Sequence, residues 1–431
     1  HGMSAIIFDM IRRYFLHLGY EVRYAQNFTD VDDKIINRAA ELSIEPGVLA
    51  ERLIEDWNDE IAALNILPAT VSPRATEEMP RIIDMIAGLI DGDHAYESNG
   101  DVYFSVRSFP EYGKLSHRNV DALMAGARID VNEEKRDPLD FALWKRAKPG
   151  EPRWESPWSE GRPGWHIECS AMCSRHLEGM VDIHGGGRDL IFPHHENEIA
   201  QSEAFSGTSP FARYWLHNGM LQLNGEKMSK SLGNVVPLRE IVESRRSAAF
   251  RLQVLQTHYR APLNFTYQGL DAAETGLARL RAAIEPADGI DQDPGDGSLD
   301  SLTDTAADAE ARFHRAMRDD FDSPIAVAAM FDLARAINRA KPRHAEAPHV
   351  ATAQQTLGNL ATILGFDLAR STEKPEREAA PLIELLIDVR QQLRSSRQFA
   401  LADLIRDRLL EQGITLEDTA KGTIWKPVER S

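Results

Sequence analysis

The sequence predicts an α/β protein with a parallel sheet, followed by a helical bundle. Up to about residue 240, short apolar strand-like runs alternate with longer helical patterns. Such alternation is typical of a parallel sheet covered by helices. Beyond residue 305, apolar residues recur at spacings of three and four, for example Phe331, Ala334 and Ile337. This spacing favours helices that pack against one another in a bundle.

The expected elements follow in chain order. A helix containing residues 11–18 precedes a strand at residues 20–24, and a strand at residues 179–183 ends at a glycine turn. Residues 95–104 form a hairpin that turns on Asn-Gly, a pair that suits positive φ at both central positions. Because this antiparallel piece interrupts the alternation, we take residues of about 88–160 as an insertion that covers the ligand edge of the sheet.

An acidic segment marks the clearest domain boundary. Residues 285–304 contain seven acidic side chains, no basic side chain, three glycines and two prolines, a composition typical of a solvated linker. We therefore predict an α/β domain, a connecting region with helices, this linker, a helical bundle and a small C-terminal module, at residues 1–240, 241–284, 285–304, 305–390 and 391–431.

Composition and charge exclude some classes of protein. The 431 residues are 42% hydrophobic and 27% charged, as in ordinary globular proteins. No apolar run approaches the length of a membrane span, so we expect no membrane partner and a cytoplasmic location. The net charge of −18 excludes a globally basic nucleic-acid coat. The last 42 residues carry eight basic and six acidic side chains, which favours this tail as a surface for a polyanion; a solvated amphipathic helix is the alternative.

The strongest local signal is the run Lys227-Met228-Ser229-Lys230-Ser231, which Leu-Gly-Asn follows. Two lysines three residues apart, flanked by small hydroxyl and glycine residues, make a loop that can place two ammonium groups on a triphosphate. Lys227 and Lys230 are therefore candidate catalytic residues. An exposed basic loop without a ligand is the alternative.

A second signal runs from Asp182 to Glu198. A strand ends there, and Gly185, Gly186 and Gly187 allow the backbone to approach a ligand closely. A helix is expected to start near Pro193, whose fixed φ suits a first turn. Asp189 lies where a carboxylate could accept hydrogen bonds from ribose hydroxyls.

The same run contains candidate metal ligands. His194 and Glu198 are four residues apart, so a helix presents both on one face. Cys169 adds a thiolate, and the three side chains together suit a zinc ion that keeps an open position for substrate. Core packing of Cys169 with a capping role for Glu198 is the alternative. We expect His195 to be structural, because adjacent helical residues point about 100° apart.

These runs together resemble a known family. The Lys227–Ser231 run is similar to that of class I aminoacyl-tRNA synthetases. The chain resembles the cysteinyl-tRNA synthetase family in three runs: Trp-His-Ile-Glu-Cys-Ser-Ala-Met, Asp-Ile-His-Gly-Gly-Gly and Phe-Pro-His-His-Glu-Asn-Glu. Further similar runs are residues 29–36, 399–403 and 422–425, so the resemblance covers essentially the whole chain.

The resemblance implies a Rossmann-like class I synthetase catalytic domain, the helical bundle, and a C-terminal anticodon-binding module. It also implies the reaction: cysteine and ATP, with Mg²⁺, form cysteinyl-adenylate and pyrophosphate, and the cysteinyl group then passes to the terminal adenosine of tRNA(Cys). One zinc ion per chain would bind the substrate thiolate, with Cys169, His194 and Glu198 as ligands. Other binding residues that the resemblance implies are His184, Trp165, Thr29, Asp189, Gly185, Gly186 and Gly187.

A zinc ion would explain how the enzyme selects cysteine over serine. Serine differs from cysteine by one atom, too little for shape to discriminate well. Zinc prefers a soft thiolate to a hydroxyl, so a metal can supply the selectivity that packing cannot. Lys227 and Lys230 would neutralise charge on the leaving pyrophosphate, with Lys230 the first choice for contact with ATP.

The start of the chain departs from the family pattern. The family carries His-Ile-Gly-His-Gly and a further zinc cysteine on the strand before it, whereas this sequence begins His1-Gly2-Met3-Ser4. We interpret His1 as the last histidine of that motif, in a chain that lacks the first strand and one ligand; a cloning remnant before Met3 is the alternative. A chain lacking these parts should hold zinc weakly and activate cysteine poorly.

Two other functions share these features. A ligase that joins cysteine to a glucosaminyl-inositol has the same fold and zinc site but needs no tRNA, and the helices after residue 305 speak against it. A catalytically inactive relative is the other alternative, and the intact Lys227 and Lys230 speak against that one. We expect a monomer that binds tRNA(Cys), with Trp425 stacking on an anticodon base. Four arginines would bind its phosphates: Arg394, Arg397, Arg406 and Arg408.

Overall fold

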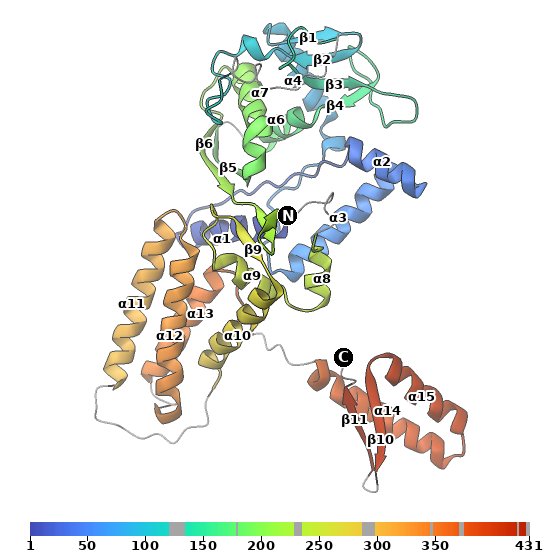
Figure 1. The fold of residues 1–431 in the computed structure, drawn as a ribbon, viewed down its shortest axis with the longest axis vertical. Coiled ribbons are helices and arrows are strands. Elements are labelled where there is room, and N and C mark those ends of the chain that lie inside the picture. The colour runs from blue at the N-terminus through green and yellow to red at the C-terminus, as the bar shows by residue number, and fades with distance from the viewer. Residues whose placement is uncertain are drawn as a thin grey trace. The chain divides into compact units, whose positions relative to one another are not determined.

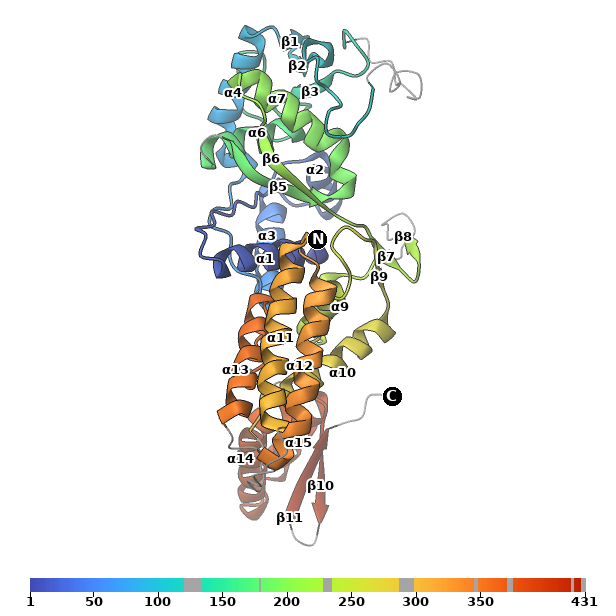
Figure 2. The same cartoon turned by 90° about the vertical axis from the view of Figure 1, so that its left-hand side faces the viewer.

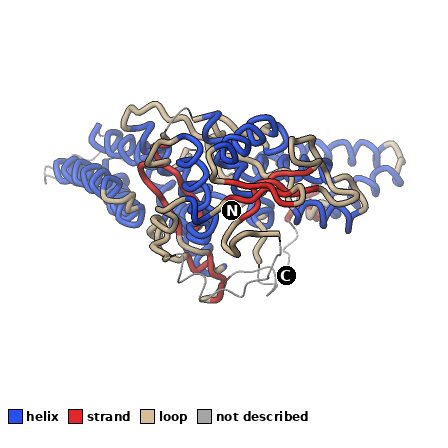
Figure 3. Tube along the Cα trace, turned by 90° about the horizontal axis from the view of Figure 1, so that it is seen from above, coloured by secondary structure: helices blue, strands red, loops and turns tan. Residues whose placement is uncertain are grey.

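The computed structural model describes residues 1–119, 134–177, 180–227, 235–286, 298–344, 348–369, 375–419 and 422–427. The chain divides into two compact units, residues 1–368 and residues 369–431, and each is described by itself. In the described residues, helices predominate and the strands form small separate sheets (Figure 3). Within these same ranges, no helix is long and apolar enough to cross a membrane.

The first unit begins with helix α1 (Gly2–His17). Ile6, Met10 and Tyr14 recur at a spacing of four, and all are buried, so one face of α1 lies in the core. This face packs against α9 (Ser247–Leu255) and α13 (Pro348–Ile363). The helix expected at residues 11–18 is therefore confirmed, as the second half of a longer helix.

The strand expected at residues 20–24 is wrong. Residues 20–24 form no strand. Just after them, the chain makes two isolated parallel bridges, one from Ala25 to Val71 and one from Phe28 to Arg74. The facing segment contains Pro68 and Pro73, and proline has no N–H to donate to a ladder. The alternating apolar pattern therefore marks a half-buried connection, which leads to α2 (Asp33–Leu42) and α3 (Pro46–Ala63).

An antiparallel sheet occupies the region expected to be an insertion. After α4 (Met79–Asp91), the strands β1 (Ala95–Ser98), β2 (Asp101–Phe104), β3 (Phe141–Arg146) and β4 (Gly161–Pro163) pair in sequence order. The hairpin on Asn99 and Gly100 is confirmed, with φ of 54° and 87° at these residues. Trp144 on β3 is fully buried, and its ring lies 6.1 Å from that of Trp158.

Parallel strands follow. After α6 (Trp165–His176), β5 (Val181–Gly187) pairs in parallel with β6 (Ala212–Asn218). Between them, short turns at Arg188–Leu190 and Ile191–His195 lead into α7 (Glu196–Ser206). Strand β7 (Leu221–Leu223) pairs with β8 (Glu226–Lys227) and, in parallel, with β9 (Leu263–Phe265). The parallel arrangement is confirmed, in two short pairs, and the strand expected at residues 179–183 is β5.

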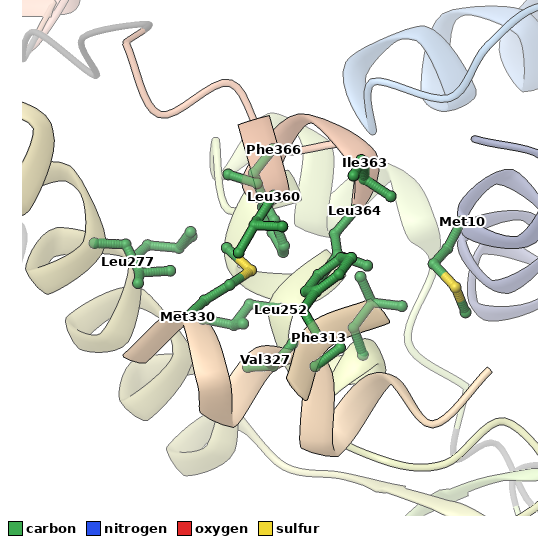
Figure 4. Packing of buried hydrophobic residues seen from close by; sticks show 14 of the residues in the cluster. Met10, Leu252, Leu277, Phe313, Val327, Met330, Leu360, Ile363, Leu364 and Phe366 are labelled. Carbon is green, nitrogen blue, oxygen red and sulfur yellow. The ribbon is translucent and has the colours of Figure 1, made fainter. Parts of the chain in front are cut away.

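The remaining helices of this unit share one core with α1. They are α8 (Leu238–Glu243), α9, α10 (Tyr267–Ile284), α11 (Ser298–Arg318), α12 (Ser323–His344) and α13. Met10 from α1, Leu252 from α9 and Phe313 from α11 all belong to this core (Figure 4). Helices α11, α12 and α13 lie side by side in both side views (Figures 1 and 2). The bundle therefore shares its interior with α1, α8, α9 and α10, and α11 starts within the segment expected to be a linker.

The second unit contains α14 (Pro375–Ser395), α15 (Phe399–Glu411) and the hairpin of β10 (Ile414–Thr419) with β11 (Gly422–Pro427). Leu416 lies opposite Trp425 in this hairpin. The division between the units falls at residues 368/369, whereas the sequence places it at 390/391. The difference arises because α14 packs on α15 and β11, while its apolar spacing alone looks like another bundle helix.

One buried ion pair joins three segments of the first unit. Arg251 on α9 is almost completely buried, and its guanidinium donates to Asp9 Oδ2 on α1 at 2.7 Å. The same group donates to the carbonyl oxygens of Leu64, at 2.9 Å, and Leu364, at 3.0 Å. These contacts satisfy the charge that burial would otherwise leave uncompensated.

We predict that Arg251→Met lowers the free energy of unfolding of this unit by about 3 kcal/mol, because Asp9 and two carbonyl groups lose a buried donor. Urea denaturation followed by circular dichroism measures the change. Arg38→Met is the matched control, since Arg38 pairs with Glu41 on an exposed surface and should change stability by less than about 0.5 kcal/mol. Equal effects of the two substitutions contradict the assignment.

A histidine pair between α1 and α11 predicts a pH dependence. The rings of His17 and His314 stack with centroids 5.0 Å apart, and burial together with His17 lowers the pKa of His314. Below pH 6.5 the unfolded chain therefore takes up a proton at His314 before the folded chain does, so this residue should lower stability as the pH falls from 7 toward 5. Comparing the thermal midpoint of the parent and His314→Gln across this range tests it; parallel curves contradict the prediction.

Candidate active site

The candidate site lies where β5 ends and α7 begins, beside α6 (Figure 1). The glycines at the end of β5 make room for the chain's own side chains. A Cβ on Gly185 would lie 2.3 Å from the Phe8 ring of α1, and one on Gly186 would lie 2.8 Å from Leu190. Packing within the chain therefore accounts for these two glycines, and their expected close approach to a ligand stays a prediction.

Three predicted metal ligands come together here. Cys169 on α6, His194 in the turn before α7, and Glu198 on α7 have ligand atoms that all lie within 4.8 Å of one another. His194 Nε2 lies 3.8 Å from Glu198 Oε2. The helical turn containing His194 runs directly into α7, so the spacing of four places both side chains on one face. A thiol, an imidazole and a carboxylate from two adjacent helices thus face one small volume.

Glu198 is the most deeply buried member of this group. It has no exposed surface, and three histidines surround its Oε2: His184 at 3.1 Å, His194 at 3.8 Å and His195 at 3.9 Å. Its other oxygen, Oε1, is buried and has no hydrogen-bond partner. An unpartnered carboxylate oxygen in such a place is costly, so the site has an unused acceptor.

Burial and charge shift the pKa values around Glu198. Burial alone would raise the pKa of Glu198, but His184 and His194 lower it well below its usual range. Burial would lower the pKa of His184, yet Glu198 raises it to about 10. Burial lowers the pKa of His194, and it lowers that of His195 to about 3. A cationic His184 therefore balances the carboxylate, and the other two imidazoles stay neutral with lone pairs available.

Burial raises the pKa of the Cys169 thiol well above its usual value, and Glu198 raises it further. Asn27 Nδ2 approaches Cys169 Sγ at 3.6 Å. The thiolate, which is the form that binds metals, therefore needs a nearby cation to form at neutral pH.

Aromatic rings cover one side of the group. Trp165 stacks on His194 with centroids 4.2 Å apart, and 45% of the Trp165 surface is exposed. His166 Nδ1 lies 2.8 Å from His194 Nδ1, so one ring donates and fixes the orientation of the other. The Thr29 hydroxyl bonds to the buried carboxyl of Glu168. Trp165 therefore lies beside His194 and His184 beside Glu198, whereas Thr29 contacts Glu168, the residue before Cys169 in the chain. Their roles in binding substrates stay predictions.

The structure describes only some of the residues that are expected to bind ATP. His1 caps the start of α1, and its ring lies 6.3 Å from Trp57. Asp189 is exposed in the turn after β5, next to Gly187. The backbone of Lys227 pairs with Gln222. Lys230 lies outside the described residues, so its predicted contact with ATP stays a prediction.

The basic residues expected to bind tRNA belong to the second unit. Arg406 on α15 pairs with Asp403 at 3.2 Å and with Asp407 at 2.9 Å, so any phosphate competes with two carboxylates for it. Arg394 lies at the end of α14 and Arg408 near the end of α15. Trp425 is half-buried on β11. Their predicted roles stay predictions.

Two neighbours of the site do not follow from sequence reasoning. His217 Nε2 lies 2.8 Å from His195 Nδ1, and the Trp215 ring lies 4.8 Å from that of His184. Both residues are on β6, two apart, and the parallel register aligns Trp215 with His184 and His217 with Gly186. Their i, i+2 spacing on a strand was the available signal, because it places both on one face of the strand.

Other members of the motif have a structural role. Glu196 on α7 is fully buried and accepts hydrogen bonds from the backbone N–H groups of Gly113 at 2.9 Å and Ser116 at 2.8 Å. The Tyr112 hydroxyl donates to Asn197 Oδ1, and Lys114 pairs with Glu203 at 2.6 Å. These contacts fasten the loop that follows β2 to α7, which carries Glu198.

Comparison with known proteins defines the class first. Residues 1–275 match the family model described as tRNA synthetases class I (C) catalytic domain, and residues 312–369 match the DALR domain. The fold is similar to that of methionyl-tRNA synthetase from Mycobacterium tuberculosis in complex with methionyl-adenylate, with a TM-score of 0.61 and 16% identity over 84% of this chain and 86% of that one. The structure thus has the fold of a class I tRNA synthetase, with a DALR domain in its helical bundle.

Sequence similarity then defines the family. The chain is 52% identical to a cysteine–tRNA ligase of Dehalococcoides mccartyi over 426 residues, which covers 99% of this chain and 91% of the relative. It is 50% identical to a cysteine–tRNA ligase of Heliobacterium modesticaldum over 434 residues, covering 98% of this chain and 90% of that one. The chain belongs to the cysteine–tRNA ligase family.

We predict that Glu196→Gln destabilises the first unit by about 2 kcal/mol, because a buried carboxylate that accepts several backbone N–H groups becomes a weaker acceptor. The midpoint of urea unfolding measures this change. Glu97→Gln, at an exposed strand position, is the control and should leave the midpoint nearly unchanged. A stable Glu196→Gln variant would mean that Glu196 does not hold the loop.

Proposed function

We propose that this chain activates L-cysteine with ATP and transfers it to tRNA(Cys). The carboxylate of cysteine attacks the α-phosphate of ATP, and pyrophosphate leaves. A ribose hydroxyl of the terminal adenosine of the tRNA then attacks the adenylate, and AMP leaves. The observation that carries this proposal is the convergence of Cys169, His194 and Glu198 on one volume in a chain of this family.

The donor set fits a zinc ion. Zinc prefers sulfur, imidazole nitrogen and carboxylate oxygen, and a catalytic zinc uses three protein ligands with one position left for substrate. Glu198 Oε1 is buried without a partner, and the neutral imidazole of His194 has a lone pair to offer. We propose Cys169, His194 and Glu198 as the ligands that would hold the ion. When bound, zinc would supply a soft Lewis acid that favours the substrate thiolate over a hydroxyl.

The surrounding residues position and enclose the amino acid in this proposal. Trp165 covers His194 with its ring, and His166 hydrogen-bonds to the far nitrogen of the same imidazole. Such outer partners fix the orientation of a ligand. His184, held against Glu198, faces the same volume and keeps the buried charge balanced. Thr29 and Asp189 would contribute hydroxyl and carboxylate groups to the substrates.

The phosphates of ATP would meet a different set of residues. We propose that Lys227 and Lys230 bind them and neutralise charge as pyrophosphate leaves, with Mg²⁺ accompanying ATP. His1 would contact the same phosphates from the start of α1, because the N-terminus of a helix favours anions. The turn after β5, with Gly187 and Asp189, would hold the adenosine.

The tRNA would bind through the helical parts of the chain. The DALR match at residues 312–369 favours a role for the bundle in tRNA binding, and the second unit would present Trp425 and its arginines to the anticodon. A monomer is sufficient for this scheme, and a cytoplasmic location remains a prediction from the sequence.

Charging of purified tRNA(Cys) with labelled cysteine tests the proposal. We expect acylation that depends on ATP, and no acylation when serine replaces cysteine. The exchange of pyrophosphate into ATP measures the first step separately. Exchange without transfer to tRNA would favour a cysteine ligase that acts on another acceptor, and failure of both would contradict the proposed activity of this chain.

We also predict that Cys169→Ala lowers zinc affinity by at least about 100-fold, because one of three protein ligands is lost. Atomic absorption after dialysis against a weak chelator measures the zinc retained. Cys173→Ala is the matched control: it removes the other cysteine, one helical turn further along α6, and should retain the metal. Equal zinc loss in both variants, or in neither, would contradict the assignment of Cys169.

A further inference from the structure

An extended segment before α2 lies against the first half of α6 and contacts one of the predicted metal ligands. The side-chain amide of Asn27 donates a hydrogen bond to Cys169, with 3.6 Å between Nδ2 and Sγ. Two residues further along, the Thr29 hydroxyl bonds to the buried carboxyl of Glu168. Residues two apart in an extended chain point to the same side. The segment therefore presents Asn27 and Thr29 together to two successive residues of α6.

Backbone hydrogen bonds hold this segment in place. The N–H group of Gln26 donates to the carbonyl oxygen of Val71 at 3.1 Å, and that of Phe28 donates to the carbonyl oxygen of Pro73 at 2.9 Å. Alternate N–H groups thus reach the same neighbouring segment, as they do in paired extended chains. Asn27 lies between these two bonds, so the position of its amide is set by the fold before any ligand binds.

A hydrogen bond to a metal-bound sulfur affects both the ligand and the ion. Outer partners of this kind fix the orientation of the ligand. The N–H group also draws electron density from the sulfur, and hydrogen bonding to cysteine sulfur is known to tune metal centres in this way. A thiolate that donates less charge leaves the ion a stronger Lewis acid. Such an ion binds a further thiolate more tightly.

We propose that Asn27 is a positioning residue for the activation of cysteine. Its amide orients Cys169 Sγ toward the volume that His194 and Glu198 share, and it limits the charge that this sulfur gives to the ion. This inference rests on the proposed function, because it assigns Asn27 to the zinc site proposed there. Asn27 acts through Cys169 and does not itself contact the substrate.

The role has a consequence for the kinetics of the reaction. A more Lewis-acidic ion favours binding of the substrate thiolate, whereas the attack on ATP takes place at the carboxylate of the amino acid. Loss of the Asn27 amide should therefore weaken binding of cysteine more than it slows the chemical step.

Replacement of zinc by Co²⁺ tests the inference without any catalytic step. The parent should show a thiolate-to-cobalt charge-transfer band in the near ultraviolet. Asn27→Leu keeps the shape of the side chain and removes its N–H donor. We expect its band to move to longer wavelength, because a sulfur that has lost a hydrogen bond gives up an electron more readily, and its affinity for Co²⁺ to fall about tenfold. Asn27→Ala removes the same donor without a bulky side chain and should move the band in the same direction.

Gln26→Leu is the matched control. It makes the same kind of change one residue away, and adjacent residues of an extended chain point to opposite sides, so the band and the affinity should stay as in the parent. Pyrophosphate exchange with the zinc-loaded variants then measures the kinetic consequence. In Asn27→Leu, KM for cysteine should rise about tenfold while kcat changes little, the pattern expected when binding energy alone is lost.

The outcomes separate this inference from the proposed function. A parent band that stays unchanged in both Asn27 variants would overturn the role of Asn27 and leave the zinc site standing. An equal shift in Gln26→Leu would also overturn it, because the band would then respond to any change in this segment. A fall in kcat without a rise in KM would contradict the kinetic consequence. A parent that binds Co²⁺ without a charge-transfer band would overturn the zinc site of the proposed function, and the role of Asn27 with it.

Discussion

The arrangement of the site depends on one buried carboxylate. Glu198 has no exposed surface, and an isolated charge in such a place is strongly unfavourable. The structure compensates it with the cationic His184, at 3.1 Å, and with two further imidazoles close to the same oxygen. Each of these side chains must then stay in place, so the β5 strand, the turn that follows it and helix α7 are held in a single geometry.

Helix α7 holds the site and the antiparallel sheet together. Its buried polar residues face in two directions: Glu198 faces the histidines, whereas Glu196 and Asn197 face the loop at residues 112–116. Every one of these polar groups is buried and therefore needs a partner. The loop and the site consequently support each other through one short helix, and a change in either is transmitted to the other by loss of buried hydrogen bonds.

The helices beyond the site are continuous with it. Helix α1 contacts β5 through Phe8, which fills the space left by Gly185, and its opposite face enters the core shared with α9 and the bundle. The buried pair of Arg251 and Asp9 adds a polar link among the same elements. The α/β part and the helical bundle of the first unit therefore share one continuous core.

Much of the site is predictable from short-range patterns. The spacing of His194 and Glu198 is enough to place both on one face of a helix, and Asn99-Gly100 is enough to define a two-residue hairpin, because each depends on backbone geometry over a few residues. The apolar periodicity likewise indicates an α/β part and a helical part, although the structure joins the two in one core. Cys169 lies 25 residues before His194, so helical spacing alone does not place the two together. The family resemblance, which the comparisons confirm, predicts that Cys169 belongs to the same site.

Only the tertiary structure decides how these local pieces combine. The register of β5 with β6 brings His217 and Trp215 to the site, and the packing of α14 assigns it to the second unit rather than the bundle. The extended segment at residues 20–24 looks like a strand but finds a partner rich in proline, so it forms no ladder. The sequence by itself determined which residue types are present and which lie on one face of an element; long-range pairing and burial decided which faces meet, because these depend on partners that local periodicity does not encode.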